Sequence, residues 1–174
     1  MRRRLFFFLL LGVLGIGTAQ QQNDRGPSTP EERKRFVEVT KRMEQAPLDK
    51  SLREEREWAV HWLIDIPDIQ VTACPVLAGV RETYRYYPEL NGQYSFSMAA
   101  FMIEHPDKSK DRVAVNMAGV EGAIRAYRAI LKAQPNATSR GMEELADKQK
   151  QGTLEKFVTE ATKDCAVEGE QKGL

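Results

Sequence analysis

Two arginines and three tyrosines within seven consecutive positions are the densest group of side chains in this sequence that could bind a ligand or a partner. They are Arg81, Tyr84, Arg85, Tyr86 and Tyr87. Tyrosine and arginine anchor many protein interfaces, because each combines apolar area with a polar end. Four of them are expected to form a binding patch: Arg81, Tyr84, Arg85 and Tyr87. The alternative is that one or two of the tyrosines fill the core while both arginines are merely solvated.

Metal ligands are sparse in this sequence. His61 and His105 are its two histidines, and neither has another histidine at helical or zinc-site spacing. We expect His61 to pair with Glu57 one helical turn away, and His105 to lie at a helix end, where a cation is favourable. Asp107, Ser109 and Asp111 have the spacing at which a calcium loop begins, but Arg112 and Ala118 stand where the loop needs its glycine and its glutamate. The sequence therefore predicts no metal site and no cofactor.

Catalytic signatures are missing as well. The sequence has no G-x-S-x-G, no H-E-x-x-H, no phosphate-binding glycine loop and no G-x-G-x-x-G. Asp65 and Asp68 flank Pro67 and could line a cleft, although capping the adjoining helices is their simpler role. We expect a non-catalytic binding or scaffold module. The alternatives left open are a small exported enzyme with unrecognised carboxylate chemistry and an inhibitor or immunity-type protein.

The N-terminus has the pattern of a secretory signal peptide at residues 1–19. Three arginines precede an apolar run at 5–17, and small residues follow up to Ala19. The run has thirteen residues, whereas a helix that spans a bilayer needs about 20. The mature chain is expected to be periplasmic or extracellular, with no stable membrane insertion after cleavage.

Cys74 and Cys165, the two cysteines of the chain, fit an exported protein. An oxidising compartment allows such a pair to form a disulfide, and a loop of this length would contribute about 4–5 kcal/mol in the chain-entropy view. The other possibility is two unpaired thiols. We expect a structural disulfide between Cys74 and Cys165, because the C-x-x-C spacing of a redox site is absent.

Charge argues against nucleic acid as a partner. Cleavage would leave 155 residues and remove three of the 26 basic residues, so that 23 would face 25 acidic ones, a net charge of −2. Such a balance offers no basic field for nucleic acid or anionic lipid. The partners we expect are a protein or a second copy of the chain.

The rest of the chain indicates one all-α domain. Residues 20–27 are polar and predict a flexible leader, residues 28–165 a helical domain, and residues 166–174 a flexible tail. We expect six or seven helices packed as antiparallel hairpins. Their predicted positions are 30–46, 51–66, 68–86, 88–105, 111–133, a short helix around 142–145, and 154–165.

Local signals set several of these boundaries. Thr29 with Glu32 and Ser51 with Glu54 have the spacing of capping boxes, and Thr153 could cap the last helix. Residues 69–73 also have the pattern of a short strand. Because the chain offers no partner strand, we expect a helix over 68–86 instead.

The helix at 111–133 carries a stripe of small residues beside its bulky one. The stripe repeats at every fourth position: Ala114, Ala118, Gly122 and Ala126. It predicts that a neighbouring helix approaches closely there, which would explain glycines that each weaken a helix by roughly 1 kcal/mol relative to alanine.

Residues 123–136 resemble the second helix of a tetratricopeptide repeat. The matching residues are Ala123, Ile124, Arg125, Ala126, Tyr127, Ile130, Leu131, Pro135 and Asn136. The first helix of the repeat would fall at 94–101, where its tryptophan and Leu-Gly residues are missing. The resemblance implies a helical hairpin that serves as a scaffold for partners. The whole chain is also similar to the uncharacterised helical proteins that many bacteria export, which supplies no functional residues.

Overall fold

The structure, a computed structural model, describes residues 25–165. The predicted signal peptide at 1–19, the first part of the leader and the predicted tail at 166–174 lie outside that range. Six α-helices make up the fold, and residues 25–165 contain no strand, so the predicted all-α class is confirmed. The helices are α1 (Pro30–Gln45), α2 (Arg53–Asp65), α3 (Tyr87–Glu104), α4 (Arg112–Ala133), α5 (Arg140–Lys150) and α6 (Leu154–Ala161). Short 3₁₀ turns occur at Lys50–Leu52, Pro75–Leu77 and Pro106–Lys108.

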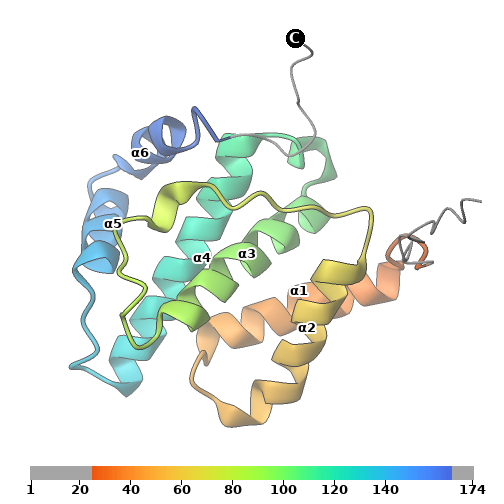
Figure 1. Cartoon of the computed structure of the whole chain (residues 1–174), viewed down its shortest axis with the longest axis horizontal. Coiled ribbons are helices and arrows are strands. Elements are labelled where there is room, and N and C mark those ends of the chain that lie inside the picture. Colours follow the sequence, from red (N-terminus) through yellow and green to blue (C-terminus); the bar gives the residue numbers. More distant parts are fainter. Residues whose placement is uncertain (1–24, 166–174) are drawn as a thin grey trace, which may run out of the picture.

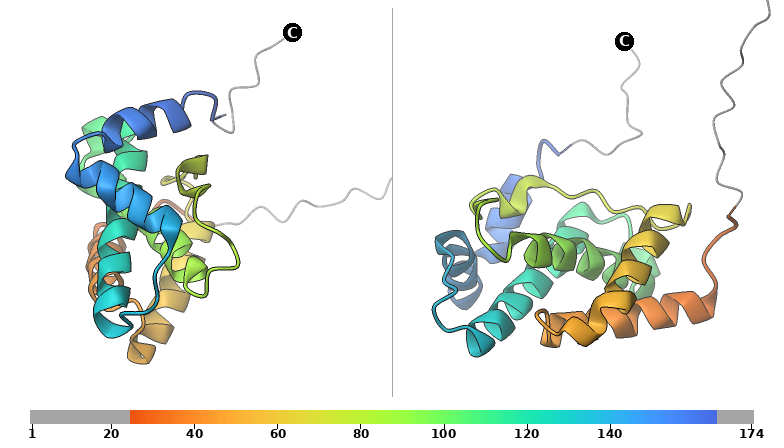
Figure 2. Two further views of the ribbon diagram at one scale, coloured as in Figure 1. Left: turned by 90° about the vertical axis from the view of Figure 1, so that its left-hand side faces the viewer. Right: turned by 60° about the horizontal axis from the view of Figure 1, so that its bottom comes forward.

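Helices α3 and α4 form the central hairpin of the molecule. Helices α1 and α2 lie on one side of this pair, and α5 and α6 lie on the other (Figure 1). Two views from other directions show the same division (Figure 2). Helix α1 packs against both α3 and α4, and Arg125 of α4 pairs with Glu44 of α1 through two hydrogen bonds of 2.7 and 2.9 Å. Helix α1 is therefore joined to the central hairpin by packing and by at least one ion pair.

The close approach predicted for the small residues of α4 is confirmed at two glycines. A Cβ atom on Gly119 would lie 2.7 Å from Met98 Cγ, and one on Gly122 would lie 2.6 Å from Ser97 Cβ. Met98 and Ser97 belong to α3, the helix in most extensive contact with α4. Ala126 is fully buried, whereas Ala114 is only half-buried. Within the stripe, Gly122 is therefore the position at which α3 approaches most closely.

Helix starts follow the sequence signals only in part. Thr29 and Glu32 form the predicted capping box of α1. The capping box predicted for Ser51 does not form, because Ser51 lies inside the 3₁₀ turn Lys50–Leu52, whose N-cap is Asp49. Thr153 stands at the start of α6, but its hydroxyl donates to Lys148 O at 3.4 Å instead of capping the helix.

The helix predicted over 68–86 is wrong. Residues 66–74 are extended and cross over α3, and the 3₁₀ turn Pro75–Leu77 and further turns lead into α3 (Figure 1). Ile69 and Cys74 are buried, whereas Gln70 and Ala73 between them are exposed. Pro75 disfavours helical backbone at Cys74 before it. An extended segment at the surface can satisfy its peptide groups with solvent, so it needs no partner strand.

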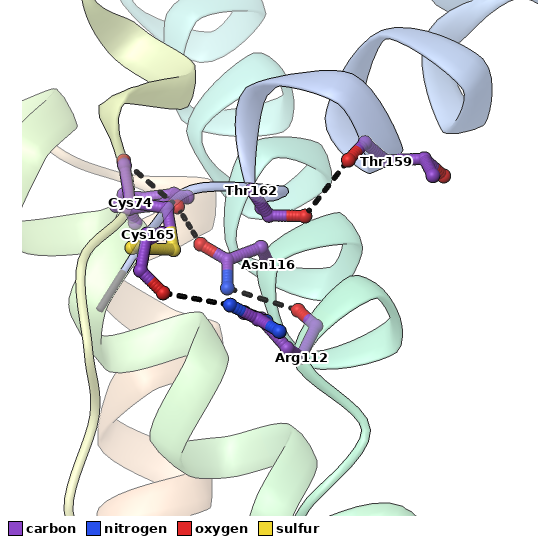
Figure 3. The surroundings of a disulfide bond; sticks show 7 residues. Cys74, Arg112, Asn116, Thr159, Thr162 and Cys165 are labelled. Carbon is purple, nitrogen blue, oxygen red and sulfur yellow. Dashed lines mark hydrogen bonds between the residues drawn. A yellow bond between two sulfur atoms is a disulfide. The ribbon is translucent and has the colours of Figure 1, made fainter. Parts of the chain in front are cut away.

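The predicted disulfide joins this extended segment to the end of α6. Cys74 and Cys165 are bonded, with Cα atoms 5.6 Å apart and a sequence separation of 91. Arg112 donates to the carbonyl oxygen of Cys165 at 2.7 Å, and Asn116 donates to the carbonyl oxygen of Arg112 at 2.9 Å (Figure 3). The first turn of α4 therefore holds the residue at which the disulfide closes.

Candidate binding site

Two of the four predicted patch residues share a cavity. They lie in the turns before α3, and not at the end of a helix as predicted. Arg81 and Tyr84 line a cavity of about 470 Å³. Arg85 is exposed, with its guanidinium carbon 5.3 Å from the centre of the Tyr86 ring, and Tyr87 is half-buried against the core at the start of α3. The structure thus brings Arg81 and Tyr84 together and leaves Arg85 and Tyr87 outside the lining.

We call this space the α5 cavity, because its second wall is the beginning of α5. Its lining consists of Gly79, Arg81, Thr83, Tyr84, Thr138, Ser139, Arg140 and Gly141. The two walls are held together at both ends. The carbonyl group of Gly79 contacts Gly141 directly, and the Tyr84 hydroxyl donates to Ala137 O at 2.6 Å. The cavity is therefore part of the packed fold, although its two walls are about 60 positions apart in the chain.

A buried hydrogen-bond network fixes the residue before α5. The backbone N–H of Ser139 donates to the Tyr127 hydroxyl at 2.9 Å, and that hydroxyl donates to Glu143 Oε1 at 2.5 Å. The backbone N–H of Glu143 donates to Ser139 O at 2.9 Å. The Ser139 hydroxyl does not cap the helix, and it bonds to no residue between 25 and 165. Ser139 is nevertheless only 7% exposed.

Both tyrosines of this region keep their protons at neutral pH. Burial, and then the nearby Tyr86, Glu89 and Glu143, raise the pKa of Tyr84 to about 12. Burial, together with the hydrogen bond to Glu143, raises the pKa of Tyr127 well above its ordinary value. At neutral pH these phenols can donate hydrogen bonds and hold structure, but they cannot serve as bases.

The two arginines of the cavity differ in their pairing. Arg140 donates to Glu144 at 2.8 Å on the surface of α5. Arg81 has no ion pair or hydrogen bond with any part of the chain that the structure describes. The neighbouring carboxylates of Glu143 and Glu144 do not line the cavity. Arg81 is thus the cation that a ligand could reach without breaking a contact.

A second, larger groove lies beside the disulfide and was missed by the sequence analysis. It measures about 940 Å³ and runs between the extended segment and the start of α4. Its polar lining includes Asp68, Lys110, Arg112 and Asn116, above an apolar floor that contains Val115. One wall of this groove is the extended segment, which the sequence predicted as part of a helix over 68–86. No local signal in the sequence therefore pointed to Lys110, Arg112 and Asn116.

Asp68 lies in that groove, but its carboxylate is already occupied. It accepts hydrogen bonds from the Ser28 backbone at 2.9 Å, from the Ser28 hydroxyl at 2.8 Å and from Arg33 at 2.6 Å. Burial alone would raise the pKa of Asp68, yet these hydrogen bonds hold it below its ordinary value. Asp68 therefore ties the extended segment to the start of α1, and does not cap a third helix. Asp65, its predicted companion, ends α2.

Neither histidine is where a ligand set would need it. His61 is exposed on α2, and its predicted pairing with Glu57 is wrong: no hydrogen bond or ion pair joins the two residues, and Glu57 accepts from Arg53 at 2.8 Å. His105 ends α3 as predicted, with its ring centre 4.6 Å from that of Phe101. Within residues 25–165 no group of three or more histidine, cysteine or acidic side chains could hold a metal ion.

Comparison of the chain with protein-family models, with curated proteins and with solved structures found no match. The resemblance of residues 123–136 to a tetratricopeptide repeat therefore stays a prediction.

Proposed function

We propose that this chain is an exported, non-catalytic helical binding module that takes a protein partner at the α5 cavity. One observation carries the proposal: an arginine without an ionic partner, Arg81, lines a cavity whose two walls are fixed to each other. Arginine and tyrosine are among the residues that most often anchor a protein partner.

The titratable groups support a binding role over a catalytic one. Three carboxylates within residues 25–165 have pKa values that are clearly shifted, and structural hydrogen bonds lower all three. Backbone donors at Thr29 and Ser51 lower the pKa of Glu32 and of Asp49, and Asp68 is bonded to Ser28. A carboxylate that acts as a general acid near neutral pH needs the opposite shift.

Export is supported by the N-terminal pattern and by the disulfide. Arginines followed by a short apolar run are typical of secretory precursors. A disulfide between distant cysteines is usual for proteins that fold in an oxidising compartment. Between residues 25 and 165 no helix is both long and apolar enough to cross a bilayer.

Site-specific photo-crosslinking in the native envelope tests this proposal. A benzophenone amino acid is placed at Thr83, in the cavity wall, or at Lys50, an exposed residue in the turn before α2. We expect a discrete protein adduct from position 83 and none from position 50. Arg81→Ala should weaken the adduct, whereas Arg85→Ala, outside the cavity, should not.

Equal adducts at both positions would contradict the proposal, and so would an adduct that Arg81→Ala leaves unchanged. The mass of the adduct separates a different protein from a second copy of the chain.

A further inference from the structure

We infer that the α5 cavity recognises a tetrahedral oxyanion, a phosphate or sulfate group, at the N-terminus of α5. The inference rests on the proposed function, because it names the chemical group that the same cavity takes from its ligand. Four features of the cavity carry it: free backbone donors, an unused hydroxyl on a buried residue, an unpaired guanidinium and a volume larger than one ion.

The first turn of α5 offers three backbone donors. The N–H groups of Arg140, Gly141 and Met142 have no partner within residues 25–165. In many helices a side chain at the N-cap satisfies one of these groups, but the Ser139 hydroxyl does not. Free N–H groups at the positive end of a helix dipole favour an anion.

Ser139 is the independent sign that a ligand belongs here. Ser139 lines the cavity and is 93% buried as a residue, and its hydroxyl bonds to no other residue of the described chain. The hydroxyl oxygen itself is not enclosed by protein atoms, so it stays open to a ligand while the rest of the residue is held in place. Thr83 and Thr138 add two more hydroxyls to the lining, and neither is bonded within the described chain.

The net positive charge around the cavity is small, so an anion bound there must be held mainly by hydrogen bonds. Arg81 supplies the free positive charge, since the charge of Arg140 is shared with Glu144. Glu143 lies on the first turn of α5 and accepts from Tyr127, so it lowers the local positive potential without lining the cavity. Hydrogen bonds, more than net charge, must therefore select the ligand.

The number of donors favours a tetrahedral oxyanion over a carboxylate. The lining residues carry the unbonded N–H groups of Arg140 and Gly141, three hydroxyls and the Arg81 guanidinium, which together are more donors than two carboxylate oxygens can serve. A cavity of about 470 Å³ is also too large for one ion. A monoester, with its organic part along the wall near Tyr84 and Gly79, fills it better than free phosphate.

Titration followed by ¹⁵N NMR tests the inference on the chain secreted from its full sequence. The probes are phenyl phosphate, inorganic phosphate and sulfate, with sodium chloride at matched ionic strength. We expect saturable shifts of the Arg140, Gly141 and Met142 amides with the oxyanions and none with chloride. Phenyl phosphate should bind more tightly than phosphate if the natural source is an ester; equal affinities would assign a free ion, and both results support the site.

Two variants and a matched control decide the assignment. Arg81→Gln should raise the dissociation constant about tenfold, the usual effect of losing a charged hydrogen bond, and Ser139→Ala should raise it severalfold. Arg85→Gln removes the same charge outside the cavity and should change nothing. Shifts that do not saturate, or equal effects of Arg81→Gln and Arg85→Gln, would overturn the inference.

The two proposals can fail separately. If the crosslink at Thr83 forms and depends on Arg81 while no oxyanion binds, only the inference about the oxyanion is wrong. If phosphate binds with the expected variant pattern and no crosslink forms, only the protein-partner proposal is wrong. Because Ser139 makes no capping bond, Ser139→Ala should fold, which far-ultraviolet circular dichroism verifies.

Discussion

Gly79 and Gly141 meet backbone to backbone. The carbonyl oxygen of Gly79 lies against the Cα of Gly141, and a Cβ atom at position 141 would be 2.7 Å from the backbone nitrogen of Val80. This contact presses the turn that carries Arg81 onto the start of α5. The α5 cavity therefore depends on a residue that contributes no side chain to it.

Gly141→Ala should consequently destabilise the protein and open the cavity. The neighbour of the new methyl group is backbone, which cannot rotate away, so we expect a loss of about 1–3 kcal/mol in the free energy of unfolding. Urea denaturation of the two proteins measures it. Gly92→Ala is the control, since its Cβ would lie 3.8 Å from Phe96 within α3. It should leave stability unchanged or raise it by up to about 1 kcal/mol.

The same reasoning applies to the contact between α3 and α4. Gly122→Ala would place a Cβ 2.6 Å from Ser97 Cβ, and we expect it to cost about 1–3 kcal/mol. Ser97→Gly removes the opposing Cβ and so makes room for the new methyl group. The double variant should therefore lose less free energy of unfolding than the sum of the losses in the two single variants. Additive effects in a urea-denaturation cycle would contradict this contact.

Helix-forming segments could be predicted because their signals are local. The α1 capping box at Thr29 and the four-residue repeat of α4 lie within a few turns of chain, and both appear in the structure. The extended segment at 66–74 could not be predicted in this way. Its conformation depends on the bond between Cys74 and Cys165 and on packing over α3, contacts that join residues far apart in the sequence.

The candidate site shows the same division. Composition alone pointed to Arg81 and Tyr84, which are close in the sequence. Ser139 and Gly141, which complete the cavity, carry no signal of their own and reach it through the contact with Gly79. Arg85 and Tyr87 belong to the same cluster of arginines and tyrosines in the sequence but do not line the cavity. The turns before α3 direct neighbouring side chains to different surroundings.

The disulfide should contribute measurably to stability. Replacement of both Cys74 and Cys165 by serine removes a link across 91 positions, for which the chain-entropy estimate is about 4–5 kcal/mol and the usual loss is about 2–5 kcal/mol. Urea denaturation with and without a reductant is the measurement. The reductant should destabilise the wild type and leave the double variant unchanged; a wild type insensitive to it would refute the structural role.

The hydrogen bonds to Asp68 predict a defined acid sensitivity. The pKa of Asp68 in the folded chain lies below the ordinary value of 3.8, so folding favours the charged form. The resulting stabilisation is complete above about pH 5 and is lost as the pH falls below 3.8 through the folded-state value.

Asp68→Asn should therefore cost about 1 kcal/mol at pH 7 and less at pH 2. Urea denaturation at both pH values measures the difference between wild type and variant, which cancels the titration of all other groups. Glu82→Gln, at an exposed residue that bonds to nothing within 25–165, is the control and should show no difference at either pH. A cost that stays constant between pH 7 and pH 2 would show that Asp68 acts by shape and not by charge.

The Tyr84 hydroxyl should hold the second end of the α5 cavity. Its 2.6 Å hydrogen bond to Ala137 O is lost in Tyr84→Phe, which keeps the ring and should cost about 1 kcal/mol. Tyr87→Phe removes a hydroxyl that makes no hydrogen bond within residues 25–165, and should be neutral. If the two tyrosine variants lose stability equally, the bond to Ala137 does not hold the cavity together.

The same tyrosine predicts a loss of stability at high pH. Folding favours the protonated phenol of Tyr84, since burial raises its pKa from 10.0 to about 12. The stabilisation by the protonated phenol should be complete below pH 10 and fall as the pH rises toward 12. Urea denaturation of wild type and Tyr84→Phe at pH 8 and pH 11 would measure this fall.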